Sequence, residues 1–125
     1  MKHYTITSYG CAEYLRHHGF TIEGEIVFNR PRVPVATIQR EVAKHFNLPL
    51  SVMKLRGTSH ARPRQVAMYL CREYTPRSLP EIGRLFGGRD HSTVLHGVRT
   101  IKKLRETDPD INAAVSALQS SLEAA

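Results

Sequence analysis

The sequence has few features of a membrane, secreted or disulfide-stabilised protein. Its two cysteines, Cys11 and Cys71, form no metal-binding or redox spacing and are expected to be free thiols. No apolar run approaches the length needed to cross a bilayer, and the N-terminus MKHYTITSYG lacks the basic-then-apolar order of a secretory signal. We therefore expect a cytoplasmic protein that has no membrane partner.

Signatures of catalysis are equally scarce. No G-x-x-x-x-G-K-[ST] loop occurs, which excludes a P-loop NTPase module. Cys11 with His17 and His18 could be imagined as zinc ligands, but no paired C-x-x-C or H-x-x-x-H framework accompanies them, so exposed helix residues are the simpler interpretation. We expect that the chain is not an enzyme and that it has no cofactor and no metal site.

Acidic residues are rare in the middle of the chain. Residues 30–105 hold 16 of the 18 lysines and arginines but only 4 of the 11 acidic residues, so this segment carries a net charge of +12. A basic block within a folded pattern favours a polyanionic partner, most often nucleic acid, because each neutralised phosphate releases condensed counterions. The alternative is a cationic surface that serves only solubility.

A length of 125 residues suits one domain with a modest core. We divide the chain into an N-terminal extension with its linker, residues 1–33, and a helical domain, residues 34–125. The extension predicts a short helix at 8–18 and a small β-hairpin around Gly24. The hairpin rests on the period-two alternation of Phe20, Ile22, Ile26 and Phe28.

From residue 34 onward the pattern predicts a compact all-α domain of several helices. Apolar residues at helical spacing predict helices over 36–46, 63–75, 79–86, 91–104 and 109–125. Asn47 is a candidate left-handed cap, and Pro63 suits the first position of the central helix. A short helix before the basic loop 54–62 should pack its apolar side chains against the core: Leu50, Val52, Met53 and Leu55.

The run SLPEIGRLFGGRDHSTVLH, residues 78–96, has the layout of a helix-turn-helix. Ser78 and Glu81 have the spacing of a capping box, and Gly87-Gly88 supplies backbone angles that a side chain would resist. The apolar stripe of the first helix consists of Leu79, Ile82, Leu85 and Phe86.

The second helix of this motif begins with short hydrogen-bonding side chains. Asp90 is a natural N-cap, and His91, Ser92 and Thr93 follow it on the polar face. Residues at the start of a recognition helix reach base edges in the major groove, and a helix N-terminus attracts phosphate. The alternative is that these residues only cap a packed helix.

The segment from Ala61 to Leu104 closely resembles the C-terminal DNA-binding domain of the bacterial replication initiator DnaA. The most specific motifs are ARPRQ at 61–65, SLPEIG at 78–83 and GGRDHSTVLH at 87–96. The resemblance implies sequence-specific binding to short, asymmetric, A·T-rich boxes in double-stranded DNA, as a nucleoid-associated monomer. It links the chain to origin binding or to regulation of replication initiation, without ATP hydrolysis.

The resemblance also implies which residues contact DNA. Arg56 aligns with the family's minor-groove arginine, and His96 would face the DNA backbone. Ser92 stands where the family more usually has threonine, so the preferred box should differ somewhat because a thymine-methyl contact is lost. The full set implied is Arg56, Arg64, Gln65, Arg72, Leu79, Pro80, Arg89, Asp90, His91, Ser92, Thr93 and His96.

Two other functions remain compatible with the sequence. A helix-turn-helix transcription regulator would use the same surface at promoters, and genomic occupancy would separate it from an origin binder. A protein-interaction scaffold would recruit a protein partner through residues 1–33 and would bind DNA without sequence preference.

Overall fold

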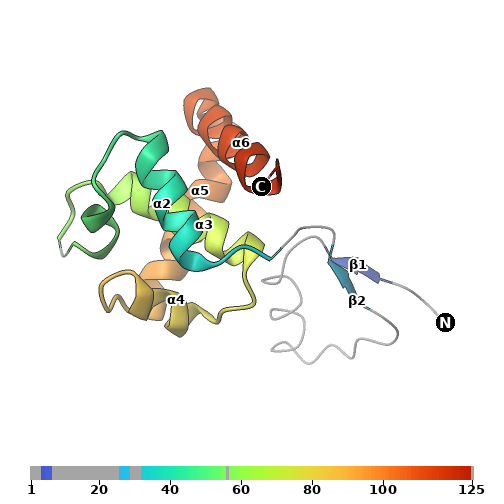
Figure 1. Cartoon of the computed structure of the whole chain (residues 1–125), viewed down its shortest axis with the longest axis horizontal. Helices are drawn as coiled ribbons and strands as arrows, with labels where there is room; N and C mark the ends of the chain where they lie inside the picture. Colours follow the sequence, from blue (N-terminus) through green and yellow to red (C-terminus); the bar gives the residue numbers. More distant parts are fainter. Residues whose placement is uncertain (1–3, 7–25, 29–31, 56, 125) are drawn as a thin grey trace.

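The computed structural model describes residues 4–6, 26–28, 32–55 and 57–124 of the chain. The predicted helix at 8–18, the residues on either side of Gly24, the imagined zinc ligands near the N-terminus and Arg56 lie outside these residues. The described part of the chain comprises two short strands, followed by the helical domain (Figure 1).

The helical domain is all-α, as the sequence predicts. Helix α3 is central and packs against α2, α4 and α5, while α6 folds back onto α5 and α2 as the expected closing helix (Figure 1). No helix among the described residues has the length and apolarity needed to span a bilayer. The elements are α2 (Val35–His45), the 3₁₀ helix η1 (Leu50–Lys54), α3 (Ala61–Tyr74), α4 (Leu79–Leu85), α5 (His91–Thr107) and α6 (Pro109–Ala124).

The strands of the extension differ from the predicted hairpin. Strand β1 (Tyr4–Ile6) pairs in parallel with β2 (Ile26–Phe28), with Tyr4 opposite Ile26. The period-two pattern therefore located a strand correctly, but the described partner of that strand lies near the N-terminus and is not antiparallel. Parallel strands need a connection of about a dozen residues or more, which the intervening segment is long enough to supply.

Helix boundaries follow local capping signals. The Ser78 hydroxyl accepts a hydrogen bond from the Glu81 N–H at 3.3 Å, and the Glu81 carboxylate accepts one from the Ser78 N–H at 3.5 Å, which confirms the capping box. Asn47 has the predicted left-handed conformation, with φ of 55°. Helix α3 begins at Ala61, two residues earlier than predicted, so Pro63 lies within its first turn, where a missing N–H costs little.

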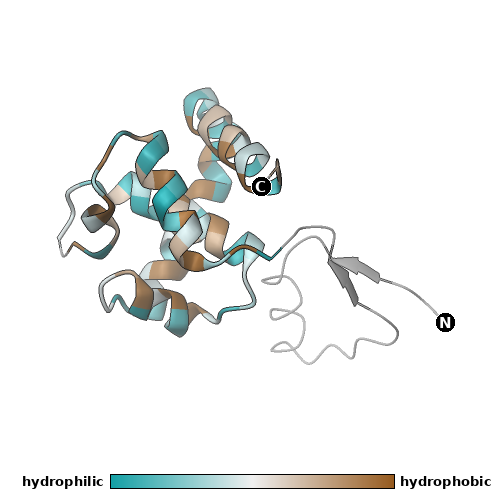
Figure 2. Ribbon diagram, in the orientation of Figure 1, coloured by the Kyte–Doolittle hydropathy of each residue, from teal (hydrophilic) through white to brown (hydrophobic). Residues whose placement is uncertain are grey.

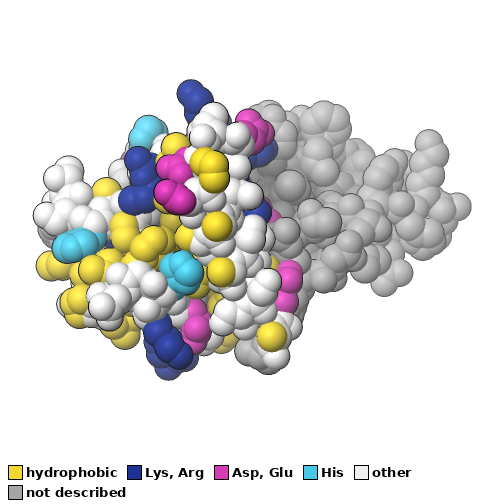
Figure 3. Space-filling view, turned by 90° about the horizontal axis from the view of Figure 1, so that it is seen from above, with side chains coloured by type: hydrophobic (Ala, Val, Ile, Leu, Met, Phe, Trp, Pro, Cys, Tyr) yellow, Lys and Arg dark blue, Asp and Glu magenta, His cyan; other side chains and the backbone are white. Residues whose placement is uncertain are grey.

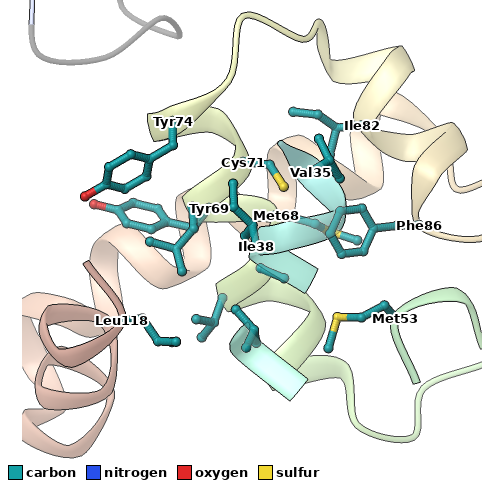
Figure 4. Packing of buried hydrophobic residues seen from close by; sticks show 14 of the residues in the cluster. Val35, Ile38, Met53, Met68, Tyr69, Cys71, Tyr74, Ile82, Phe86 and Leu118 are labelled. Atoms are coloured by element: carbon teal, nitrogen blue, oxygen red, sulfur yellow. The ribbon is translucent and has the colours of Figure 1, made fainter. Parts of the chain in front are cut away.

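The core is formed by apolar residues from every described helix, and Figure 2 shows hydrophobic residues alternating with hydrophilic ones along these helices. Figure 4 shows Tyr69 and Tyr74 of α3 next to each other on the same side of the core as Leu118 of α6, with Phe86 and Met53 on the opposite side. Cys71 is completely buried among these residues, and this desolvation raises the pKa of its thiol.

Three leucines predicted to be buried are exposed instead. Leu50 is 53 % exposed and Leu55 46 %, whereas Val52 and Met53 between them are buried. Because η1 is only five residues long, it presents its middle to the core and leaves its flanks in solvent. Leu85, the last residue of α4, is 37 % exposed, while Phe86 is fully buried.

Candidate nucleic-acid interface

Helices α4 and α5 meet in a tight turn formed by residues 86–90. Gly87 and Gly88 have φ of 79° and 74°, a left-handed backbone that side chains disfavour. The turn is closed by the Arg89 N–H, which donates to the Gly83 carbonyl at 2.8 Å. A β-carbon on Gly83 would lie 2.1 Å from the Arg89 carbonyl oxygen, so α4 and the turn are in direct backbone contact. The predicted helix-turn-helix is thus formed.

The first turn of α5 is exposed and rich in polar groups. The Asp90 carboxylate accepts hydrogen bonds from the Ser92 hydroxyl and from the Ser92 N–H, the latter at 3.3 Å, which confirms Asp90 as the N-cap. These bonds, and then the charge of nearby His91, hold the pKa of Asp90 below its usual value. His91 Nδ1 lies 3.3 Å from Asp90 Oδ1, and Ser92 and Thr93 are exposed beside it. This turn therefore offers solvent an ionised carboxylate, an imidazole and two hydroxyls.

The start of α3 lies beside α5. A β-carbon on Gly97 would be 3.2 Å from Gln65 Cγ, so the Gln65 side chain lies against α5 at Gly97, and the preceding residue, His96, is exposed. The Arg62 guanidinium donates to Gln65 Oε1 at 2.8 Å and remains exposed. The structure thus places Gln65 close to the residue that follows His96 in α5.

Three more of the predicted DNA-contacting residues lie on α3 and α4. Arg72, in the last turn of α3, and Leu79, at the start of α4, are half-buried, whereas Pro80 is exposed. Leu79 packs against the core cluster, so part of its side chain has a structural function. Their contacts with DNA remain predictions.

Two arginines assigned to DNA bind the main chain of the protein itself. Arg64 is only 2 % exposed and donates to the carbonyls of Val52 at 3.2 Å and Gly57 at 2.9 Å. Burial, and then the charge of Arg89, lower the pKa of Arg64. The half-buried Arg89 donates to the Leu55 carbonyl at 2.5 Å. In this conformation the Arg64 guanidinium is occupied inside the protein, and its proposed DNA contact stays a prediction.

The sequence analysis did not predict these hydrogen bonds, which attach the basic loop to the rest of the domain and are called its bracing below. The hydrogen bond from Arg89 to Leu55 joins residues 34 positions apart, and no local pattern encodes such a pair. The available signal was Gly87, where a β-carbon would lie 2.5 Å from the Lys54 carbonyl oxygen. A glycine at this place in the turn therefore marks a close approach to another segment.

Charges of both signs are interspersed on the face seen in Figure 3, the view from above Figure 1, where α6 is uppermost. Acidic, basic and hydrophobic side chains lie next to one another there, which is unlike a uniformly basic surface. Among the described residues, no three His, Cys, Asp or Glu side chains gather in a way that could hold a metal ion.

Comparison with known proteins identifies relatives of the helical domain. The family described as "Bacterial dnaA protein helix-turn-helix" matches residues 35–101, more than half of the chain. The chain is 56 % identical over 95 residues to the chromosomal replication initiator protein DnaA of Sphingopyxis alaskensis, and 54 % identical over 95 residues to that of Ruegeria sp. strain TM1040. Each alignment covers 74 % of this chain but only 21 % and 20 % of those proteins, so the chain spans about a fifth of their length.

A longer alignment reaches into the extension. The chromosomal replication initiator protein DnaA of Herminiimonas arsenicoxydans is 44 % identical over 121 residues, which cover 88 % of this chain and 26 % of that protein. That share includes part of residues 1–33. From the closed helix-turn-helix and these matches together, we conclude that the chain belongs to the bacterial DnaA helix-turn-helix family.

Proposed function

We propose that this chain binds double-stranded DNA sequence-specifically at DnaA-box-type sites, in origin binding or in the regulation of replication initiation, without hydrolysing ATP. The observation that carries the proposal is the exposed first turn of α5, which presents Asp90, His91, Ser92 and Thr93 directly after a closed helix-turn-helix turn. The relatives' names support the link to replication initiation. The protein would act in the cytoplasm, on the nucleoid.

Recognition in the major groove would use the start of α5. Short side chains there let the helix backbone approach the bases, and the helix N-terminus attracts a phosphate. The ionised Asp90 carboxylate repels phosphates but accepts a hydrogen bond from the N4 amino group of cytosine, so it favours a base edge over the DNA backbone. His91 and Thr93 would complete the base and phosphate contacts.

Electrostatic attraction would come from the basic segment that surrounds this turn. Residues 30–105 carry a net charge of +12, and both Lys54 of the basic loop and Arg62 at the start of α3 are exposed. Arg56, in the same loop, would enter the minor groove, where narrow A·T-rich sequence favours arginine. Residues 1–33 remain a candidate surface for a protein partner. We propose that the protein binds its asymmetric site as a monomer.

Fluorescence anisotropy with two labelled duplexes tests the proposal. One duplex carries a DnaA-type box and the other a scrambled sequence, and each is titrated at low and near-physiological salt. We expect the box to bind at least about a hundredfold more tightly near physiological salt. Equal binding that collapses as salt rises would refute sequence-specific recognition and favour the scaffold interpretation.

A matched pair of histidine variants localises the interface. His91→Ala should weaken binding to the box by about 1–3 kcal/mol and leave the scrambled duplex nearly unaffected, because a base contact is lost. His45→Ala removes an exposed histidine from the last turn of α2 and should leave both affinities unchanged. Equal affinities for wild type and His91→Ala would remove His91 from the interface.

Genomic occupancy at promoters instead of the origin would favour a transcription regulator.

A further inference from the structure

Arg89 lies in the helix-turn-helix turn, but its side chain reaches the basic loop, which ends at residue 60 in the structure because α3 begins at Ala61. Its Nη1 donates to the Phe86 carbonyl at 2.6 Å within the turn. Its Nη2 donates to the loop carbonyls of Leu55 at 2.5 Å and Gly57 at 3.4 Å. One guanidinium therefore joins the turn to the two residues that flank Arg56 in sequence.

Two further contacts bind the same loop. Buried Arg64 of α3 donates to the Gly57 carbonyl at 2.9 Å and to the Val52 carbonyl at 3.2 Å. The backbone of Gly87 approaches the Lys54 carbonyl so closely that a β-carbon would be 2.5 Å from its oxygen. The loop is thus attached on both sides of Arg56, to the turn and to α3.

We infer that Arg89 is a positioning residue that fixes the basic loop to the helix-turn-helix, so that the loop and the start of α5 meet DNA as one surface. This inference rests on the proposed function. It gives Arg89 a function other than direct contact with DNA, because Nη1 and Nη2 of its guanidinium donate to three carbonyls of the protein.

The chemistry of the side chain explains why arginine suits this position. A guanidinium is planar and has five N–H donors in a fixed fork, so it bridges carbonyls of two segments at once. A lysine ammonium keeps the charge but is a compact point donor that does not reproduce the fork. Arg89→Lys therefore separates positioning from charge, since a lysine would still bind a phosphate electrostatically.

Hydrogen exchange on the free protein tests the bracing without DNA. We expect Arg89→Lys to speed exchange of the amides at 55–61 about tenfold, while the amides of α3 and α5 beyond their first turns keep their protection. Arg40→Lys is the matched control, because Arg40 is an exposed α2 residue whose hydrogen bond goes to Thr37 of the same helix. Unchanged exchange in the loop of Arg89→Lys would overturn the inference.

A double-mutant cycle then tests the effect on DNA binding. Arg89→Lys should weaken binding to the box about tenfold in the wild type and less than about twofold in Arg56→Ala, because Arg89 acts through the loop that carries Arg56. A direct phosphate contact would instead give losses that multiply, and such a result would overturn the inference. If no variant prefers the box, the proposed function fails, while the exchange experiment still decides the bracing.

Discussion

Gly83 lies where α4 contacts the helix-turn-helix turn, and Gly83→Ala tests this contact directly. A β-carbon there would be 2.1 Å from the carbonyl oxygen of Arg89 and 3.1 Å from its carbonyl carbon. Both are backbone atoms, which cannot rotate away as the end of a flexible side chain does. The turn must therefore shift, and the hydrogen bond from the Arg89 N–H to the Gly83 carbonyl is strained with it.

The expected magnitude is a difference between two effects. Replacing a helical glycine by alanine gains about 0.5–1 kcal/mol of helix propensity. Overpacking by a methyl group costs about 1–3 kcal/mol, and the higher end applies because the overlap is with backbone. We therefore expect Gly83→Ala to lower the free energy of unfolding by about 2 kcal/mol. In a domain of this size that lowers the Tm by roughly 8–16 °C.

Gly97→Ala is the matched control, because Gly97 is also a buried helical glycine. Its β-carbon would be 3.2 Å from Gln65 Cγ and 3.4 Å from Met68 Sδ, both in flexible side chains. We expect the propensity gain and the packing cost to cancel to within about 1 kcal/mol. Urea unfolding followed by far-UV circular dichroism measures both variants. Equal stability of Gly83→Ala and wild type, or equal losses in the two variants, would refute the argument.

Three further outcomes follow from single side chains. The hydrogen bond from Arg77, together with the capping box, holds the pKa of Glu81 below its usual 4.5, so the stabilisation by this carboxylate is present at neutral pH and is lost as the pH falls through the lowered pKa. Between about pH 5 and 3, the urea midpoint of Glu81→Gln should therefore fall less than that of wild type. Equal falls in the two proteins would contradict this prediction. In a Cys11→Ser background, the buried Cys71 thiol, whose pKa is raised, should react with a thiol reagent only after unfolding, and rapid labelling of the native protein would contradict its burial. Tyr74→Phe removes a 2.9 Å hydrogen bond to α6 and should cost about 1 kcal/mol in urea unfolding, whereas an unchanged midpoint would show that this bond does not stabilise the domain.

Much of the helical domain is predictable because its signals are local. The capping box at Ser78, the N-cap at Asp90 and the left-handed Asn47 each depend on residues within a few positions. The same holds for the exposed polar start of α5, since capping and amphipathic spacing together decide which side chains face solvent. The exposed polar first turn of α5 could therefore be predicted from the sequence, whereas its contacts with DNA stay a prediction.

Errors occurred where neighbours in space are distant in sequence. The exposure of Leu50 and Leu55 depends on how far the core extends beyond η1. The spacing of apolar residues in the sequence carries no information about this distance. Strand β2 has a parallel described partner near the N-terminus, although the local alternation suggested a hairpin. In both cases the local pattern predicted the type of secondary structure correctly, but the packing partners come from distant parts of the sequence, which a local pattern does not specify.

The sequence by itself determined the helices of the domain, the turn between α4 and α5 and the polar first turn of α5, because hydrogen bonds and side-chain spacing within a few residues define them. Only the tertiary structure decided which acceptors Arg64 and Arg89 bind within the protein. The sequence predicts both as DNA contacts, and folding brings carbonyls of the loop within their reach. A guanidinium binds the acceptors that lie around it, and those acceptors come from segments that meet only in the folded chain.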